Sequence, residues 1–398
     1  MRLTAFREST GAVLSPFETA VQDVPVLSGT LGDAQRAAVD AAGVDWVDVE
    51  PAGPHVRFTD RCWFTADAVR RLIAQNAHGR VVVDDADWLL TCGPLQPAGG
   101  VTELALHPGG GQPLAELPLL HLDLGLRTHT ATPPPAVLSH IQRPLRLGPA
   151  MVHGIHHWTH LGRVNQLALA AIAEQIGVDL QQASLLRKIW AGVRTVARAG
   201  SLDPVRIAAS LSTVGKGCQV HPTAVVEMSA LADNVEVGAY AVLRGTTVGE
   251  GARIEEHATV IGSTLGAGAR VGRYGMITWC TLFSGASVSS GSGFQFSVFG
   301  PNSFVAMGAT ALDISFGRPV QVLHEGQMVD SGHHMLGVAV GARAVVGQGV
   351  RLQHGATVPA GMMLVRDGAD LYRGGEVAGV ATVRNGLVVP LKNSEPGD

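Results

Sequence analysis

Side chains that transfer protons or bind anions are concentrated in one segment, residues 312–336. This segment contains Asp313, Arg318, His324, Glu325, Asp330, His333 and His334. A histidine oriented by a carboxylate can act as a general base, and His324 directly precedes Glu325. The sequence therefore predicts His324 as the first candidate base, with Asp313, Asp330, His333 and His334 as substrate-binding residues. The alternative interpretation is a hairpin that only pads the neighbouring structure.

A second candidate base, His257, belongs to a series of aromatic residues. Tyr240, His257 and Tyr274 follow one another at equal intervals along the sequence. One interpretation is an aromatic ladder that supports a contact between subunits. The other is a histidine base flanked by two substrate-binding tyrosines in a cleft between subunits. Arg273 and Arg318 would then bind phosphate groups, because a guanidinium matches phosphate with paired N–H donors.

Four histidines occur within eight residues around Trp158. On a helix, His153 would pair with His157 and His156 with His160, a spacing that suits a transition metal. No acidic residue lies nearby in the sequence to support such ligands. We favour the start of a helix that packs on the repeat-containing part of the chain described below, and assign no metal to this cluster.

The elements that position these residues follow from a repeat that begins at Val214. Apolar residues recur at spacings of six, six and five, and this pattern is repeated over nearly six turns. Three apolar columns result: Val214, Leu231, Val248, Leu265, Leu282 and Phe299; Val220, Val237, Ile254, Val271, Val288 and Val305; Val226, Leu243, Val260, Ile277, Phe294 and Ala311. An amphipathic helix does not produce this pattern. It predicts coils of three short strands that stack as a triangular prism.

The corners of these coils also have a sequence signal. Residues that accept positive φ stand three positions after the first column: Gly217, Asn234, Gly251, Gly268, Gly285 and Asn302. Residues one coil apart should lie above one another, so Glu227 would face Arg244, Glu236 would face Arg253, and Glu256 would face Arg273. The register fails after Ala311 and resumes at Val340. We therefore expect residues 312–336 to form a loop extruded from the prism.

At these residues the chain resembles the hexapeptide-repeat transferases. This family of left-handed β-helix acyltransferases includes the C-terminal half of the bifunctional N-acetylglucosamine-1-phosphate uridylyltransferase/glucosamine-1-phosphate acetyltransferase. The segment Val358–Gly361 is similar to the family's closing turn. The resemblance implies a left-handed parallel β-helix over 214–366, a homotrimer with sites between subunits, and acyl-CoA or acetyl-CoA as donor. It also places Arg273 where the acetyltransferase has its catalytic histidine, and a guanidinium cannot act as that base.

The segment before the β-helix has a different character. Helix-like patterns cover 33–42 and 67–75, and strand-like patterns cover 44–49 and 81–83, so residues 1–130 are expected to form a small α/β domain. The run Asp60–Ile73 resembles degenerate sugar nucleotidyltransferase-like domains. Their glycine-rich phosphate loop is missing, since residues 2–25 contain only Gly11 and no lysine. We expect a non-catalytic domain in which Asp84, Asp85 and Asp87 form a polar strand end, with magnesium binding as the alternative.

The remaining segments complete the expected organisation. Residues 131–213 are a proline- and glycine-rich linker followed by helices, at about 164–176, 180–199 and after Asp203, that would cap the first coil. Residues 367–398 form a C-terminal tail. With 29 Lys and Arg against 33 Asp and Glu, no basic surface for nucleic acid is expected. Scattered cysteines and the absence of an apolar leader favour a cytoplasmic protein without membrane contact.

Two functions are consistent with these patterns. The first is acyl transfer from acyl-CoA to a sugar nucleotide or a related small acceptor. The second is a non-catalytic trimeric binding or scaffold protein derived from such enzymes. A carbonic anhydrase of the β-helix type is disfavoured, because His257 is distant in the sequence from the histidines of 324–334.

Overall fold

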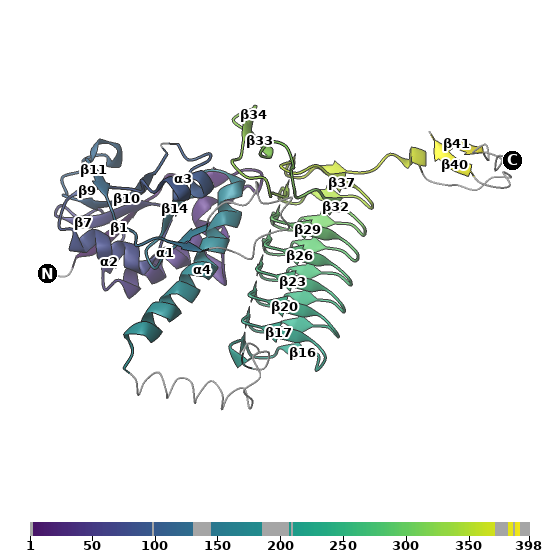
Figure 1. Ribbon diagram of the computed structural model, residues 1–398, viewed down its shortest axis with the longest axis horizontal. Helices are drawn as coiled ribbons and strands as arrows, with labels where there is room; N and C mark the ends of the chain where they lie inside the picture. Colours follow the sequence, from purple (N-terminus) through teal and green to yellow (C-terminus); the bar gives the residue numbers. More distant parts are fainter. Residues whose placement is uncertain are drawn as a thin grey trace.

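A six-stranded sheet forms the centre of the N-terminal region (Figure 1). The computed structural model describes residues 3–97, 99–129, 145–184, 207, 210–370, 381–384 and 387–390. The strand order is β11-β9-β10-β7-β1-β6, and only β10 runs against the others. The strands are β1 (Thr4–Glu8), β6 (Asp45–Val47), β7 (His55–Thr59), β9 (Gly79–Val82), β10 (Val101–His107) and β11 (Leu119–His121). The chain passes from β1 to β6 on one side and then to β7 on the other. The carboxyl ends of β1 and β7 therefore form a topological switch point, where open α/β sheets bind ligands.

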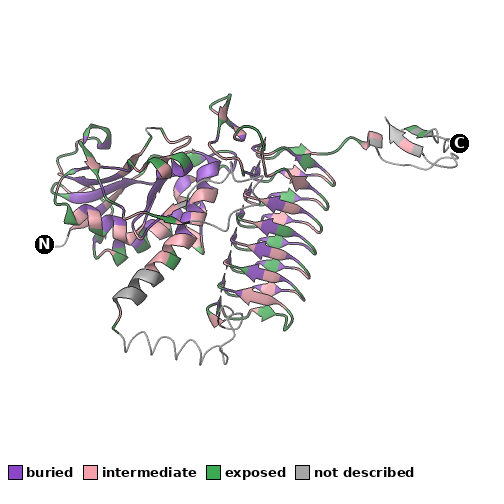
Figure 2. Cartoon of the chain, viewed as in Figure 1, coloured by how far each residue is buried: buried purple, intermediate pink, exposed green. Residues whose placement is uncertain are grey.

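Helices α1 (Leu31–Ala41) and α2 (Ala66–Ala74) share a core with this sheet. Leu31 and Leu72 are buried together with Val56 and Phe58 of β7, and Figure 2 shows the buried residues concentrated in the sheet. Thr30 begins α1 with a capping box, which satisfies backbone N–H groups at the helix start. Both helices and strands β6 and β9 lie where the sequence predicts them, so the expected α/β region is confirmed.

Shorter elements connect and cover this sheet. They are β2 (Val13–Leu14), β3 (Thr19–Ala20), η1 (Val21–Asp23), β4 (Pro25–Val26), β5 (Gly29–Thr30), β8 (Cys62–Phe64), α3 (Ala86–Cys92), η2 (Leu114–Glu116), β12 (Arg127–His129), β13 (Leu145–Leu147) and β14 (Val152–Gly154). Strand β14 pairs with β8, which connects the segment before the long helix to the N-terminal sheet region. Residues 130–144 of the predicted linker lie outside the described residues.

Three all-parallel sheets form the second half of the protein, as the repeat predicts. Sheet 1 contains β15 (Thr213–Val214), β18 (Ala230–Leu231), β21 (Thr247–Val248), β24 (Thr264–Leu265), β27 (Thr281–Leu282), β30 (Val298–Phe299), β35 (Ala339–Val340) and β38 (Thr357–Val358). Sheet 2 contains β16 (Gln219–Val220), β19 (Glu236–Val237), β22 (Arg253–Ile254), β25 (Arg270–Val271), β28 (Ser287–Val288), β31 (Phe304–Val305), β36 (Val345–Val346) and β39 (Met363–Leu364). Sheet 3 contains β17 (Val225–Glu227), β20 (Val242–Arg244), β23 (Thr259–Ile261), β26 (Met276–Thr278), β29 (Gly293–Gln295), β32 (Thr310–Ala311) and β37 (Arg351–Leu352).

The predicted apolar columns form the interior of this parallel β-helix. Leu265, Val271 and Ile277, which belong to one coil, are all buried in the same cluster. Consecutive coils pair in register, so each residue lies beside its counterpart one repeat later, for example Leu265 beside Leu282. The fold is thus mainly β, and the three stacked sheets confirm the predicted parallel β-helix.

Glycines two residues apart serve different purposes at the corners. Gly268 has φ +65, and a Cβ there would meet no atom within 4 Å, whereas a Cβ at Gly266 would lie 2.6 Å from the Ser284 backbone nitrogen. We predict that Gly268→Ala lowers the free energy of unfolding by about 1 kcal/mol through its left-handed backbone. Gly266→Ala should cost about 3 kcal/mol, because the next coil must move away. Urea unfolding of both variants measures the difference, and a larger loss in Gly268→Ala would contradict this assignment.

Helix α4 (Trp158–Gln182) lies between the N-terminal sheet and the β-helix (Figure 1). Asn165 connects three parts of the protein: its Oδ1 accepts hydrogen bonds from the Leu27 N–H at 2.8 Å and from Thr264 Oγ1 at 3.0 Å, and its Nδ2 donates to Thr281 Oγ1 at 3.3 Å. The predicted capping helix at 164–176 is thus part of α4 and runs along sheet 1 rather than over the first coil. Val214 in that coil is 56% exposed. The helices predicted at 180–199 and after Asp203 lie mostly outside the described residues.

The loop at 312–336 leaves the β-helix after β32, and the coils resume at β35. It contains a hairpin of β33 (Gln321–His324) and β34 (Gln327–Asp330). Val320 and Val322 are buried in the core cluster of the N-terminal region, so the hairpin packs toward that region of its own chain. After the last coil follow η4 (Gly368–Asp370) and a hairpin of β40 (Ala381–Arg384) and β41 (Leu387–Pro390). None of the described helices is long and apolar enough to cross a membrane.

Candidate functional site

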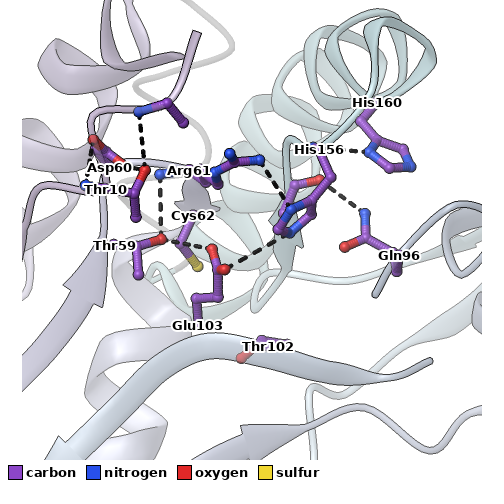
Figure 3. Close-up of polar contacts among 12 residues, drawn as sticks. Thr10, Thr59, Asp60, Arg61, Cys62, Gln96, Thr102, Glu103, His156 and His160 are labelled. Atoms are coloured by element: carbon purple, nitrogen blue, oxygen red, sulfur yellow. Dashed lines mark hydrogen bonds and ion pairs between the residues drawn. The ribbon is translucent and has the colours of Figure 1, made fainter. Parts of the chain in front are cut away.

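A polar cluster occupies the switch point of the N-terminal sheet (Figure 3). Strand β10 is antiparallel to β7, so Glu103 near its start lies beside Thr59 at the end of β7. Thr59 Oγ1 donates a hydrogen bond to Glu103 Oε2 at 2.6 Å. Arg61 Nη1 donates to His156 Nδ1 at 3.3 Å, and His156 Nε2 lies 3.9 Å from Glu103 Oε1. The cluster brings together an acid, a base and a cation from segments far apart in the sequence.

Burial sets the protonation of this cluster. Desolvation raises the pKa of Glu103, although the hydrogen bond from Thr59 opposes that shift. Desolvation, together with the positive charge of Arg61, lowers the pKa of His156 to about 4. Both shifts favour neutral side chains. Because His156 Nδ1 accepts the hydrogen bond from Arg61, the neutral ring carries its proton on Nε2, the nitrogen that faces Glu103.

The loop after β1 is tied to the same edge of the sheet. Asp60 accepts hydrogen bonds from the Thr10 N–H at 2.9 Å and from Thr10 Oγ1 at 2.6 Å (Figure 3). Asp85 caps α3 and forms an ion pair with Arg146 at 2.6 Å, and Asp84 contacts His121 at 2.9 Å. The carboxylates of Asp84 and Asp85 thus have protein partners, as expected of a polar strand end.

The four histidines around Trp158 hold the start of α4 in place. His160 Nδ1 accepts hydrogen bonds from the backbone N–H groups of His156 and His157, and its Nε2 donates to the Pro94 carbonyl at 2.9 Å. His153 stands on β14, before the helix, and its Nδ1 donates to the Gly154 carbonyl. These ring nitrogens bond to backbone groups, and the cluster forms the start of a helix, as the sequence predicts.

These histidines are buried in their neutral forms. Desolvation lowers the pKa of His153 to about 3 and that of His157 to about 4, and it places the pKa of His160 well below the ordinary value. His160 accepts backbone N–H groups through Nδ1 and donates through Nε2, and His157 donates through Nε2 to the Leu323 carbonyl. A pH change that protonates them would therefore break backbone contacts at the start of α4.

The first candidate base, His324, meets this histidine segment. Its ring lies edge-on to the ring of His157, with centroids 5.5 Å apart, and His157 Nε2 donates to the Leu323 carbonyl at 3.2 Å. The extruded loop thus brings two polar segments of the sequence together within one chain. His324 is half-buried at the tip of β33.

The other candidate residues of the extruded loop remain close to that loop. His334 Nδ1 donates to the Ser315 carbonyl, and Asp330 accepts from the Gly332 N–H. The backbone carbonyls of Asp313 and Arg318 accept from the Leu336 N–H and from Ser315 Oγ. His333 Nδ1 lies 3.4 Å from Arg163 Nη2 on α4. The loop therefore does not gather these residues around one centre with His324.

The second candidate base, His257, lies on the corner between sheets 2 and 3. Its ring stacks between those of Tyr240 and Tyr274, with centroids 5.1 Å and 4.8 Å away and interplanar angles of 18° and 8°. All three residues have positive φ, which is the corner conformation. Tyr240 and Tyr274 are 58% and 65% exposed. The stack of the predicted aromatic ladder is present, and its role in a contact between subunits stays a prediction.

A groove along sheet 2 adjoins this corner. It is open to solvent and is lined by Arg253, Arg270 and Arg273 together with Glu236, Glu255 and Glu256. Each arginine contacts a glutamate: Arg273 Nε lies 2.7 Å from Glu256 Oε2, Arg253 pairs with Glu236 at 3.1 Å, and Arg270 pairs with Glu255 at 3.5 Å. The predicted charge ladder, including Glu227 with Arg244 at 2.7 Å, is confirmed. The three pairs of the groove are exposed to solvent and therefore contribute little to the stability of the fold.

One other group of side chains in the described part of the chain could hold a metal ion. The ligand atoms of Glu50, His55 and His107 all lie within 4.8 Å of one another. Arg57 Nη1, however, lies 2.7 Å from Glu50 Oε1 and 3.3 Å from His107 Nε2. The guanidinium already supplies a positive charge at this position. The group is therefore an internal ion-pair network rather than a metal centre.

Sequence reasoning did not find Arg61, Glu103 or the Glu50–His55–His107 group. Period-two alternation along β7 places His55, Arg57 and Thr59 on one face, which is unusually polar for a central strand. This alternation is the sequence signal that could have indicated a polar site on the face of β7. No protein-family model and no curated protein matches the chain.

Proposed function

We propose that the protein is a hexapeptide-repeat transferase that moves an acyl group from acyl-CoA to a sugar nucleotide or a related small acceptor. The observation that carries the proposal is the exposed imidazole of His257 beside a groove that contains three arginines. The β-helix is left-handed in this proposal, as in the family that the repeat resembles. The protein is a homotrimer, and each site is completed by a neighbouring subunit.

The arginines of the groove suit the phosphates of CoA. Arg253, Arg270 and Arg273 already have carboxylate partners, but exposed pairs of this kind are weak. A phosphate group carries more charge than a carboxylate and accepts two parallel N–H donors from one guanidinium. Phosphates of the donor therefore replace glutamates as partners, and the acyl thioester extends toward the corner.

His257 is the base in this arrangement. It takes the proton from the acceptor hydroxyl or amine as that atom attacks the thioester carbonyl, and the C–S bond then breaks to release CoA as its thiol. We place the reaction at His257 rather than at His324, because the ring of His324 packs against His157 of the same chain. Arg273 does not act as a base and instead binds phosphate.

The surfaces that remain for trimerisation agree with this arrangement. The outward threonines Thr264 and Thr281 of sheet 1 are 1% exposed beneath α4. Sheets 2 and 3 meet at the aromatic corner on the opposite edge. We assign the subunit contact to this corner, since it presents aromatic rings beside alternating charges.

A second candidate function is a non-catalytic binding or scaffold protein. The observation in its favour is that all three arginines of the groove are paired with glutamates of the same chain. A neutral, alternating surface is suited to contacts between subunits as well as to a ligand.

An acyl-CoA experiment separates the two functions. We expect acetyl-CoA and longer acyl-CoAs to raise the Tm of the full chain, and we expect thiol release when a sugar nucleotide is added. Arg270→Gln combined with Arg273→Gln should remove the shift, whereas Arg127→Gln, on the N-terminal region, is the matched control. If none of the acyl-CoAs raised the Tm or released thiol, the result would contradict the transferase proposal and favour the non-catalytic scaffold protein.

A further inference from the structure

A cavity lies between one face of α4 and the corner that joins sheets 3 and 1. Residues of α4 at helical spacing form one wall: Trp158, Gly162, Arg163 and Gln166. Trp279 and Phe296, on consecutive coils, form the other wall together with His333 of the extruded loop. Within the cavity, the centre of a water-sized molecule can occupy a volume of about 30 Å³. This is room for about two waters or one small oxyanion.

Two buried donors at this cavity lack an acceptor. Trp158 is 2% exposed, and neither its Nε1 nor the Nε of Arg163 has a hydrogen-bond partner among the described residues. An indole N–H and a guanidinium N–H can only donate. Buried donors are nearly always paired in folded proteins, so these two require an acceptor within the cavity.

The charge of Arg163 points to the same kind of occupant. Its Nη1 donates to Gln166 Oε1 at 2.9 Å, and its Nη2 donates to His333 Nδ1 at 3.4 Å. No lining residue is acidic, and Arg163 forms no ion pair with any carboxylate in the described chain. Burial, and also the charge of Arg163, lowers the pKa of the nearby His153. A cation in these surroundings is stabilised by an anion.

The walls of the cavity keep this space open. A Cβ at Gly162 would meet no atom within 4 Å, and this glycine is part of the cavity lining. The ring of Trp279 lies over Gly262, where a Cβ would come within 2.5 Å of it, and this contact fixes the indole. Aromatic walls lower the local dielectric, which strengthens the attraction between Arg163 and an anion.

We propose that this cavity is a binding site for a small inorganic oxyanion, with phosphate as the physiological form. The anion accepts hydrogen bonds from Trp158 Nε1 and from the Arg163 guanidinium. It thereby joins α4 to the corner of the β-helix and to the extruded loop. The site is separate from the proposed transferase groove, which adjoins the corner between sheets 2 and 3, so either can fail without the other.

The test uses the full chain and inorganic phosphate. We expect phosphate to raise the Tm relative to sodium chloride at the same ionic strength, with a saturable heat of binding in calorimetry. Sulfate, which has the same shape, should compete. Arg163→Gln should raise the Kd at least about tenfold, because the charge-assisted bonds are lost. Arg351→Gln, an exposed arginine on sheet 3, is the matched control and should bind as the wild type does.

A second variant keeps the test decisive if Arg163→Gln folds poorly. Gly162→Leu fills the cavity and replaces a helical glycine, so it should abolish phosphate binding without lowering the Tm in chloride. Equal stabilisation of the wild type and Gly162→Leu by phosphate would overturn the proposal. So would a wild-type protein that neither phosphate nor sulfate stabilises, since the cavity then holds water alone.

Discussion

Replacing His257 with phenylalanine is expected to lower kcat/KM for acyl transfer by about 10²–10⁴-fold, the usual contribution of a general base. Phenylalanine preserves the stack between Tyr240 and Tyr274, so the Tm and the oligomeric state should stay close to those of the wild type. Thiol release with saturating acyl-CoA measures the rate, and sedimentation measures the assembly.

Two comparisons make the His257 result specific. His78→Ala, at an exposed histidine of the N-terminal region, should retain full activity. His324→Ala should also retain most of it, because that ring packs on His157. If His324→Ala were inactive while His257→Phe turned over normally, the base would lie on the extruded hairpin, and the placement above would be wrong.

The free energy of unfolding should fall steeply as the pH drops below 6.5. The folded protein holds His153, His156 and His157 with pKa values of about 3, 4 and 4, whereas an unfolded histidine titrates near 6.5. Below pH 6.5 the unfolded chain binds protons that the buried rings cannot, so stability is lost from pH 6.5 down to about 4. Each histidine contributes about 1.4 kcal/mol per pH unit, which gives about 4 kcal/mol per unit for the three.

Glu103 acts in the opposite sense. Because burial raises its pKa, the folded state binds its proton before the unfolded state does, and this partly offsets the loss at low pH. Urea midpoints measured at pH 7, 6 and 5 test the balance. His156→Gln keeps a polar side chain but removes one titrating ring, so its slope should be shallower by about 1.4 kcal/mol per pH unit. An unchanged slope in that variant would show that His156 is not buried in its neutral form.

The β-helix was predictable because its constraints recur. Val271 inside, Gly268 at a corner and Arg270 outside each have counterparts one repeat away, so many positions report the same geometry. The coil register, the aromatic stack and the charge pairs follow directly from that period. The end of the regular coils at Ala311 also marked the extruded loop.

The arrangement of α4 was less predictable, because an amphipathic pattern does not identify what a helix packs against. One signal did exist. The outward positions of sheet 1 include Thr247, Thr264 and Thr281, while the equivalent positions of sheet 2 include Arg253 and Arg270. A column of threonines in place of charges indicates a covered face. The meeting of Glu103 with His156 has no such periodic signal, since it depends on how β10 and β14 are placed by the whole domain.

Two attachments between the N-terminal region and the β-helix have a consequence for the evolution of chain length. Asn165 bonds to the coils at Thr264 and Thr281, and His157 bonds to Leu323 of the hairpin further along. Solenoids ordinarily gain or lose whole repeats, because each coil contacts only its neighbours. Here both attachments come from the start of α4, so the spacing between the two attached parts of the β-helix is set by the helix. We therefore expect duplications of a coil to be tolerated before Thr264 and after Arg343, whose neighbour Ala342 bonds to Pro16, while the number of coils between Thr281 and the hairpin is fixed.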